Sequence, residues 1–196
     1  MSILRELGVP VFDAGGMPKI DLSTYILSVG GIVREERHFS WPEILVMPKN
    51  QVNCRLTSVS GWSVRADWEG IKWRDFLKQI SVDSKANHVR FTTTGGDYRT
   101  VVPCKDLENP RVLLAYGVNG EPIEPDYGGP LRMIIPNLWG YKSCKWLGSI
   151  EFIGQMEGGY WEDRGYTRSG AIEPGITLDI NTKTRRTIKG GEVTEF

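Results

Sequence analysis

Short strand-like runs, each closed by a tight turn, are the feature that most constrains how this chain folds. Residues 88–94 and 98–102 alternate apolar and polar side chains on either side of Gly95-Gly96-Asp97, and residues 112–118 end at Asn119-Gly120. Glycine and Asn-Gly turns of this kind join antiparallel strands. Because the alternation has a period of two, these runs predict strands with one buried face, paired with their neighbours in the sequence.

Other segments predict further strands and a few short helices. Four runs rich in β-branched and aromatic residues are expected to be strands, at residues 24–33, 52–64, 131–135 and 146–153. Ser40, Pro42 and Glu43 form a helix-start signature for a two-turn helix over 40–47, and apolar spacing predicts a second helix within 68–80. Strands and helices do not alternate regularly, so we expect an α+β fold, a strand-rich mixed or barrel-like sheet with short helices.

The chain is long enough for one core. With 196 residues, 40% of them hydrophobic, we predict one domain over residues 1–175 and a C-terminal extension over residues 176–196. Residues 9–18, rich in Gly and Pro, are expected to form an irregular loop. The polar residues from 177 onward are expected to be extended or mobile.

Charge and hydropathy exclude several functions. The 24 basic and 24 acidic residues cancel, whereas a protein that holds nucleic acid over its whole surface needs a basic excess. We therefore expect no nucleic-acid partner, and any anion site must be local. No run approaches the roughly 20 apolar residues of a membrane span, and charges at Arg5 and Glu6 interrupt the apolar run that a signal peptide needs. A cytoplasmic protein without a membrane span is the expectation.

Familiar catalytic motifs are absent from the sequence. His38 and His88 are its two histidines, too few for a His-rich metal site. Cys54, Cys104 and Cys144 are odd in number and far apart, which argues against a disulfide framework or a Cys-x-x-Cys site. We interpret these thiols as buried or incidental.

One stretch combines glycine turns with cations. Gly128-Gly-Pro-Leu-Arg132 leads into an apolar strand, and Gly140-Tyr-Lys-Ser-Cys-Lys-Trp146 follows it. A turn of this kind can offer backbone N–H groups, the Ser143 hydroxyl and the ammonium groups of Lys142 and Lys145 to one phosphate. Solvated strand-end cations are the alternative interpretation.

The order of several motifs resembles the sulfite oxidase family of molybdopterin-dependent oxidoreductases. The motifs are Arg55-Leu-Thr-Ser-Val-Ser-Gly-Trp62, Leu113-Leu-Ala-Tyr-Gly-Val-Asn-Gly120, Tyr127-Gly-Gly-Pro-Leu-Arg132, Gly140-Tyr-Lys-Ser-Cys-Lys-Trp146 and Gly159-Tyr-Trp-Glu-Asp-Arg-Gly-Tyr166. The likeness extends over residues 9–170 and is greatest to the small bacterial and archaeal members, which include methionine sulfoxide reductase catalytic subunits. It implies the family's mixed α+β domain and a molybdenum cofactor bound through its pterin.

The resemblance also implies roles for individual residues. The implied cofactor contacts are Phe12, Asp13, Thr93, Tyr127, Arg132, Ser143, Cys144 and Lys145. Of these, Arg132 and the turn at 143–145 would hold the pterin phosphate, and Thr92 or Thr94 could take the place of Thr93. Tyr166 matches a tyrosine beside the metal, and an ordinary half-buried tyrosine is its alternative interpretation.

The chain departs from the family pattern at two cofactor positions. Ser58 stands where the family has its molybdenum-ligating cysteine. A serine hydroxyl is less acidic than a thiol, so the site has an alkoxide ligand, a solvent ligand or no functional metal, and an engineered change is a further alternative. Cys54 could replace the thiol only along a different loop path. Tyr127 stands where relatives have His or Asn, and it can still donate one hydrogen bond.

A third departure concerns the substrate. Ser63 and Asp13 stand where sulfite oxidases place arginines, so we expect a small substrate other than sulfite. The predicted function is oxygen-atom and two-electron transfer at molybdenum, with Tyr166 and Ser58 as catalytic residues and a separate electron carrier as partner. The alternative is a non-catalytic member that binds the pterin or a protein partner. A strand-rich binding domain whose motifs are only structural is a third possibility.

Overall fold

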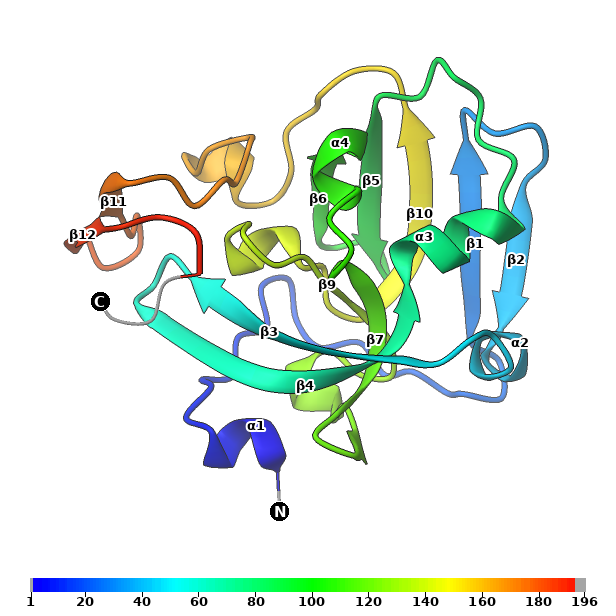
Figure 1. Ribbon diagram of the computed structural model, residues 1–196, viewed down its shortest axis with the longest axis horizontal. Helices are drawn as coiled ribbons and strands as arrows, with labels where there is room; N and C mark the ends of the chain where they lie inside the picture. Colours follow the sequence, from blue (N-terminus) through cyan, green and yellow to red (C-terminus); the bar gives the residue numbers. More distant parts are fainter. Residues whose placement is uncertain (1, 193–196) are drawn as a thin grey trace.

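The computed structural model describes residues 2–192 and contains two five-stranded sheets (Figure 1). The first sheet has the order β2 (Arg37–Ser40), β1 (Ile26–Gly31), β10 (Leu147–Ile153), β5 (His88–Thr93) and β6 (Arg99–Pro103). The pairing of β1 with β10 is parallel and the other pairings are antiparallel. The mixed α+β class expected from the sequence is confirmed, and the two sheets do not close into one barrel.

The second sheet is built on a long hairpin. Its strands are β3 (Asn50–Ser58), β4 (Trp62–Lys72), β7 (Leu113–Val118), β8 (Glu121–Pro122) and β9 (Arg132–Ile134). They follow the order β3-β4-β7-β8, and β9 pairs with residues 113–115 of β7, whereas β8 pairs with residues 117–118. Strand β3 pairs with β4 from Asn50 to Ser58, which places Ser58 at the tip of the hairpin opposite Trp62. The predicted turns at Gly95–Asp97 and at Asn119-Gly120 are both present.

Helices are short, and all but α1 lie next to a strand in the sequence or in a turn between strands. They are α1 (Ile3–Glu6), α2 (Trp41–Leu45), α3 (Trp73–Phe76) and α4 (Cys104–Leu107), with 3-10 turns η1 (Leu77–Gln79), η2 (Pro125–Tyr127), η3 (Gly140–Lys142) and η4 (Glu162–Arg164). Helix α2 is the predicted first helix, and Glu43 Oε2 accepts from the backbone N–H of Ser40 at 2.8 Å. This capping box fixes its start.

The second predicted helix is present within residues 68–80, because α3 and η1 together run from Trp73 to Gln79. Strand β4 continues to Lys72, and helical structure begins only at Trp73. At Gly70, strands β4 and β7 are so close that an added Cβ would lie 1.9 Å from the carbonyl oxygen of Leu114 on β7. Pairing with β7 therefore keeps residues 68–72 in the strand and sets the start of the helix at Trp73.

Two large apolar clusters fill the space between these elements, and a third, minor one lies beside the C-terminal hairpin. The larger lies against the first sheet and centres on Trp73, whose ring meets Phe91 edge-on at 5.7 Å and stacks with Phe152 at 6.1 Å. The smaller lies under the second sheet and includes Trp68 and Tyr127, both almost fully buried. Removing a side chain as large as Trp73 costs about 3–5 kcal/mol, so these clusters hold the two sheets in place.

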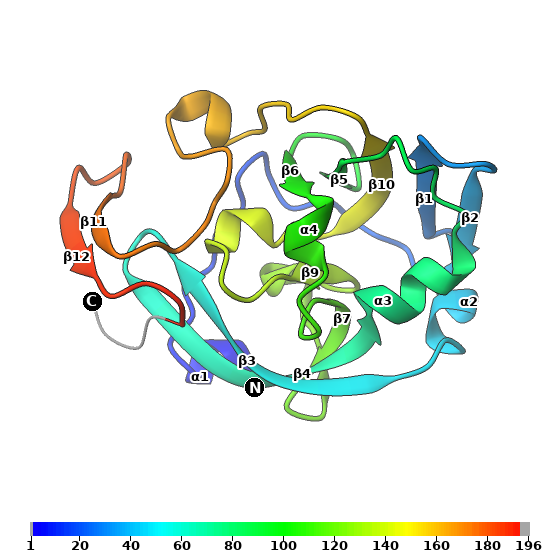
Figure 2. The ribbon, with the colours of Figure 1, turned by 45° about the horizontal axis from the view of Figure 1, so that its top comes forward.

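The C-terminal segment forms a hairpin. Strands β11 (Gly175–Leu178) and β12 (Arg185–Ile188) pair with each other and lie beside the tip of the β3–β4 hairpin in both ribbon views (Figures 1 and 2). The extended conformation predicted for the segment is correct, but its pairing was not foreseen. The predicted boundary at 175/176 falls inside β11, and residues 193–196 lie outside the described residues.

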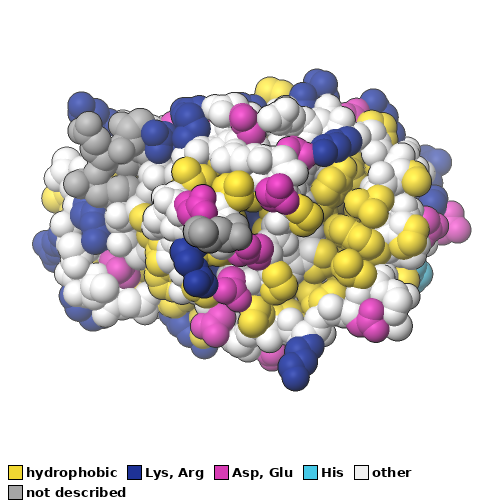
Figure 3. All heavy atoms as spheres, turned by 90° about the horizontal axis from the view of Figure 1, so that it is seen from below, with side chains coloured by type: hydrophobic (Ala, Val, Ile, Leu, Met, Phe, Trp, Pro, Cys, Tyr) yellow, Lys and Arg dark blue, Asp and Glu magenta, His cyan; other side chains and the backbone are white. Residues whose placement is uncertain are grey.

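The surface mixes charges of both signs with one apolar area. On the underside of the molecule, hydrophobic side chains gather toward the side where α2 and β2 lie (Figure 3). Exposed apolar side chains near α2 include Leu45 and Val46, and Val46 is 83% exposed. Within residues 2–192, no helix has the length and apolarity needed to cross a membrane.

Candidate active site

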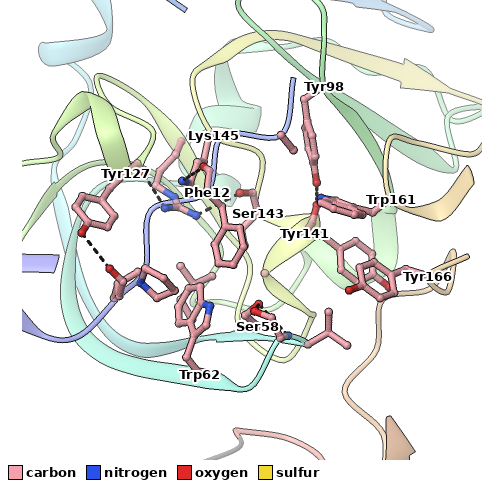
Figure 4. Close-up of a pocket in the computed structure, with 18 of the residues that line it drawn as sticks. Phe12, Ser58, Trp62, Tyr98, Tyr127, Tyr141, Ser143, Lys145, Trp161 and Tyr166 are labelled. Atoms are coloured by element: carbon pink, nitrogen blue, oxygen red, sulfur yellow. Dashed lines mark hydrogen bonds between the residues drawn. The ribbon is translucent and has the colours of Figure 1, made fainter. Parts of the chain in front are cut away.

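A cavity lies among the N-terminal loop, the tip of the β3–β4 hairpin and the turn at 140–146. Eight of the ten predicted site residues line it: Phe12, Ser58, Thr93, Tyr127, Arg132, Ser143, Lys145 and Tyr166. Asp13 and Cys144 do not. Figure 4 shows Lys145 and Tyr127 on one side of the cavity and Tyr166 on the other, with Ser58 and Trp62 along one edge.

Arg132 is fixed beneath the cavity by backbone carbonyls. The side chain is 3% exposed, and its Nη1 and Nη2 atoms donate to the carbonyl oxygens of Tyr127 at 2.7 Å and Ser143 at 3.3 Å. The glycine turn before Arg132 allows this position, because a Cβ on Gly129 would lie 1.9 Å from the carbonyl oxygen of Ile123. Burial lowers the pKa of Arg132 to about 10, and the guanidinium stays charged at neutral pH.

Lys145 places a second cation beside Arg132. Its Nζ donates to the carbonyl oxygens of Phe12 at 2.7 Å and Asp126 at 3.2 Å, which ties the N-terminal loop to the turn. Burial and then repulsion by Arg132 lower the pKa of Lys145 to about 7, while Asp13 and Asp126 act in the opposite direction. The predicted Asp13 thus lies near the site as an exposed charge that favours the Lys145 ammonium.

The two cations have no acidic partner in direct contact. Among the ion pairs formed within residues 2–192, none includes Arg132 or Lys145. An uncompensated buried charge costs several kcal/mol, and two adjacent ones repel each other as well. The site is therefore chemically suited to a buried anion such as the terminal phosphate of a pterin cofactor, and the residues present fit that group.

The part of the cavity next to Arg132, Ser143 and Lys145 is called the phosphate end. Neighbouring groups supply further hydrogen-bond donors and line this end. The Ser143 hydroxyl accepts from the backbone N–H of Ile135 at 3.0 Å, so its own hydrogen is left for a ligand. Trp146 lines the cavity with a left-handed backbone, φ +47°, and its ring lies 5.1 Å from Lys145 Nζ. Trp62 Nε1 is buried on the cavity wall without a hydrogen-bond partner. A buried donor of this kind needs an acceptor from a ligand or a water, and the cavity has room for either.

The polar groups of three predicted contacts are directed into the protein or buried in it. Thr93 is the threonine of its run that lines the cavity, and its hydroxyl donates to the carbonyl oxygen of Lys145 at 3.2 Å. Tyr127 gives its one hydrogen to the carbonyl oxygen of Val9 at 3.0 Å, so it offers the cavity a ring instead of a donor. Cys144 is buried behind the wall, and burial raises its pKa to about 12.

Lys142 does not belong to the phosphate end, contrary to the sequence interpretation. Its ammonium is fully buried and donates to Glu162 Oε1 at 2.5 Å and to the carbonyl oxygen of Val101 at 2.8 Å. Thr100 donates to the same carboxylate oxygen at 2.6 Å. Lys142 is thus one half of a structural ion pair.

Ser58 lies at the end of β3 with its hydroxyl in a local hydrogen-bond pair. Its Oγ lies 2.8 Å from the Oγ of Ser60 and accepts from the backbone N–H of Ser60 at 3.2 Å. Cys54 cannot take its place, because four residues of strand separate the two side chains by about 13 Å. Burial also raises the pKa of the Cys54 thiol to about 12. No cluster of His, Cys, Asp or Glu side chains suited to a metal is found within residues 2–192.

Aromatic rings form the wall opposite the phosphate end. Tyr166 stacks on Tyr141 at 5.1 Å and lies 5.5 Å from Trp161. Both neighbours, together with Tyr98 and Asn181, line the cavity but were not predicted. Tyr141 and Trp161 lie inside the motifs quoted from the sequence, so their motif membership was a usable signal. Asn181 belongs to the C-terminal hairpin, and nothing in the sequence indicated it.

The comparisons with known proteins assign this site to a family. A family model described as an oxidoreductase molybdopterin binding domain matches residues 14–161. The chain belongs to that family. It is a molybdopterin-binding oxidoreductase of the sulfite oxidase type, as the resemblance of its motifs predicted.

Relatives in this family have several different names. YuiH of Bacillus subtilis, an uncharacterized oxidoreductase, is 34% identical over 164 residues, which cover 82% of each chain. The protein-methionine-sulfoxide reductase catalytic subunit MsrP of Xanthomonas axonopodis pv. citri is 31% identical over 81% of this chain and 54% of its own length. Sulfite oxidase of Arabidopsis thaliana is 30% identical over 88% of this chain and 52% of its own length. The chain thus spans about half the length of these two relatives.

A solved structure supports the fold. The crystal structure of the sulfane dehydrogenase SoxCD from Paracoccus pantotrophus matches with a TM-score of 0.67 and 16% identity. The match covers 88% of this chain and 46% of that chain. At this level of identity the likeness shows a common fold.

Proposed function

We propose that the cavity binds the molybdenum cofactor and uses it for oxygen-atom and two-electron transfer on a small neutral substrate. The observation that carries this proposal is the pair of adjacent cations, the buried Arg132 and the partly buried Lys145, neither of which forms an ion pair within residues 2–192. When bound, the cofactor supplies the two-electron chemistry, and the protein supplies orientation and electrostatics.

The residues of this chain divide the work by position. Arg132, Lys145 and Ser143 hold the phosphate, with charge-assisted hydrogen bonds from the first two. The rings of Tyr127 and Trp146 enclose the pterin, and the unpartnered Trp62 Nε1 donates a hydrogen bond to it. Ser58 and Tyr166 lie away from the phosphate end and face the reacting groups.

We infer a neutral substrate because the cations of the cavity lie at the phosphate end and not beside Ser58 and Tyr166. The lining residues, all within the described part of the chain, include Arg132 and Lys145 as their cations. The Ser58 and Tyr166 side instead offers hydroxyls and aromatic faces. Ser63 hydrogen-bonds to Thr57 Oγ1 at 2.9 Å and does not line the cavity. A doubly charged substrate such as sulfite would gain little there.

The experiment is cofactor analysis of protein produced in a host that synthesises the cofactor. Molybdenum and extractable fluorescent pterin should each approach one equivalent in the wild type and fall at least tenfold in Arg132→Met. Arg90→Met is the matched control, because Arg90 pairs with Glu151 and Glu157 at the surface. Wild-type protein that contains neither metal nor pterin would refute cofactor binding. Rapid oxidation of sulfite by loaded protein would refute the proposed neutral substrate.

A non-catalytic pterin-binding protein is the second candidate, and one observation favours it. The Ser58 hydroxyl is already engaged with Ser60 at 2.8 Å, and Cys54 lies four residues away along the same strand. The variant Ser58→Cys separates the two functions. A catalytic site with an alkoxide ligand should change its redox potential and its turnover in this variant, whereas a site that has lost its chemistry for other reasons should stay inactive.

Two further predictions belong to the whole protein. We propose a separate electron carrier as the redox partner, which a screen of reduced and oxidised dyes and of carrier proteins tests by stopped-flow absorbance. The cytoplasmic location is also a proposal, and fractionation of cells that express the intact gene tests it.

A further inference from the structure

The turn of the C-terminal hairpin holds a buried carboxylate against the candidate active site. Asp179 follows β11 and is 1% exposed. Its Oδ1 accepts from the Tyr166 hydroxyl at 3.0 Å and from the backbone N–H of Asn181 at 3.0 Å, and its Oδ2 accepts from the Thr182 hydroxyl at 2.8 Å. Three donors fix this carboxylate, so its position does not depend on Tyr166 alone.

Tyr166 is held from its other sides by rings. It stacks on Tyr141 with an angle of 17° between the ring planes, and Trp161 covers it at 5.5 Å. Tyr141 is itself anchored, since its hydroxyl donates to the carbonyl oxygen of Thr167 at 2.7 Å. The ring of Tyr166 therefore has little freedom to move, and in this fixed position its hydroxyl is within hydrogen-bond distance of Asp179.

This contact decides what Tyr166 can do. A phenol has one hydrogen to donate, and here Asp179 receives it. Burial and then the bond to Asp179 raise the pKa of Tyr166 above its ordinary value, although Arg186 and the backbone of Ile180 act in the opposite direction. The hydroxyl stays protonated at working pH and presents only lone pairs to other neighbours.

We propose that Asp179 is a positioning residue of the active site, which fixes Tyr166 as a hydrogen-bond acceptor toward the cavity. The group held beside Tyr166 then carries an N–H or O–H donor, for example a hydroxyl, a bound water or an amide of the substrate. This assignment rests on the proposed function for its catalytic meaning. It differs from the role expected for a tyrosine that donates to the reacting group, and it makes the C-terminal hairpin part of the site.

The test combines Asp179→Ala, Asp179→Asn and Tyr166→Phe with the Asp179→Ala/Tyr166→Phe double variant. In loaded enzyme we expect Asp179→Ala to lower kcat about 10- to 100-fold, because a misaligned site loses that much, with a smaller change in KM. Asp179→Asn keeps an acceptor oxygen for Tyr166 and should recover much of the loss. In the Tyr166→Phe background, Asp179→Ala should have no further effect on kcat.

A control and a readout without turnover keep the proposal falsifiable. Thr187→Val on the exposed face of β12 should leave kcat, pterin content and melting temperature unchanged. Ultraviolet resonance Raman difference spectra between each protein and its Tyr166→Phe partner report whether this phenol donates. The donor signature should be present in the wild type and absent from Asp179→Ala, with or without cofactor.

Two results would contradict the role proposed for Asp179. Multiplicative effects of the two substitutions on kcat, or the same Raman signature in wild type and Asp179→Ala, would overturn the positioning role. A wild type that carries no metal or pterin overturns the proposed function instead, and in that case the Raman comparison still decides what Asp179 does to Tyr166.

Discussion

The variant Lys145→Met should make the cofactor-free protein more stable while it abolishes cofactor binding. The pKa of Lys145 falls from 10.5 to about 7 on folding, because the ammonium is buried next to Arg132. At about 1.4 kcal/mol for each pKa unit, this shift corresponds to about 5 kcal/mol against the folded state when Lys145 is charged. Nearby solvent and the two hydrogen bonds that methionine cannot make reduce the expected gain to about 2 kcal/mol.

The pH dependence gives this prediction its sign. The folded-state pKa lies below the unfolded one, so the penalty is complete below pH 7 and disappears as the pH rises toward 10.5. Urea unfolding of cofactor-free protein should therefore show the gain of about 2 kcal/mol at pH 6 and less than about 1 kcal/mol at pH 9. Pterin content after expression should fall at least tenfold, because the phosphate loses a charge-assisted donor.

The neighbouring lysine is the matched control. Lys142→Met removes the partner of the buried Glu162 carboxylate and should cost about 3–5 kcal/mol, since an unpaired buried charge remains. Two lysines of the same turn are thus expected to give opposite signs. A loss of stability in Lys145→Met at pH 6, or a gain that is the same at pH 6 and pH 9, would refute the reasoning about an uncompensated cation.

Two further outcomes are expected. Gly129→Ala should cost about 2–4 kcal/mol and release the cofactor, because its Cβ would overlap the carbonyl of Ile123. Gly120→Ala meets open space and should cost only about 1 kcal/mol for its positive φ, as urea unfolding of both variants will show. Burial raises the pKa of Cys54 and Cys144 to about 12, so a thiol reagent at pH 8 should label native protein at Cys104 first, and fast labelling of Cys54 would contradict its burial.

Elements that depend on local chemistry could be predicted from the sequence. The turns at Gly95–Asp97 and Asn119-Gly120, and the capping box of Ser40 and Glu43, need only neighbours in the chain. The parallel pairing of β1 with β10 could not be predicted, because it joins Ser28 to Ser149 across most of the sequence. Short strand β2 lies at a sheet edge and begins with the polar residues Arg37 and His38. Its sequence therefore lacks the apolar alternation that predicts a strand.

The same division holds for the site. Motif order alone brought together most of the residues that line the cavity, but it could not tell Lys142 from Lys145. Both belong to one turn, and only the placement of Glu162 behind that turn makes Lys142 structural. Nor could it show that Tyr127 and Tyr166 have already given their hydrogens to Val9 and Asp179. Hydrogen-bond direction depends on tertiary neighbours that a motif does not contain.

The two ends of the cavity are built from different parts of the chain, and this has a consequence for specificity. The phosphate end, with Arg132, Ser143 and Lys145, lies inside the residues that match the family model, whereas Tyr166 and the Asp179 turn lie beyond them. The hairpin packs against the Tyr166 end of the cavity through Asp179, Asn181 and Ile188, and none of these residues contacts Arg132 or Lys145 in a hydrogen bond within residues 2–192. If the proposed function holds, a substitution in the C-terminal hairpin should therefore change kcat while it leaves pterin content unchanged, and a loss of pterin would contradict this separation of the two ends.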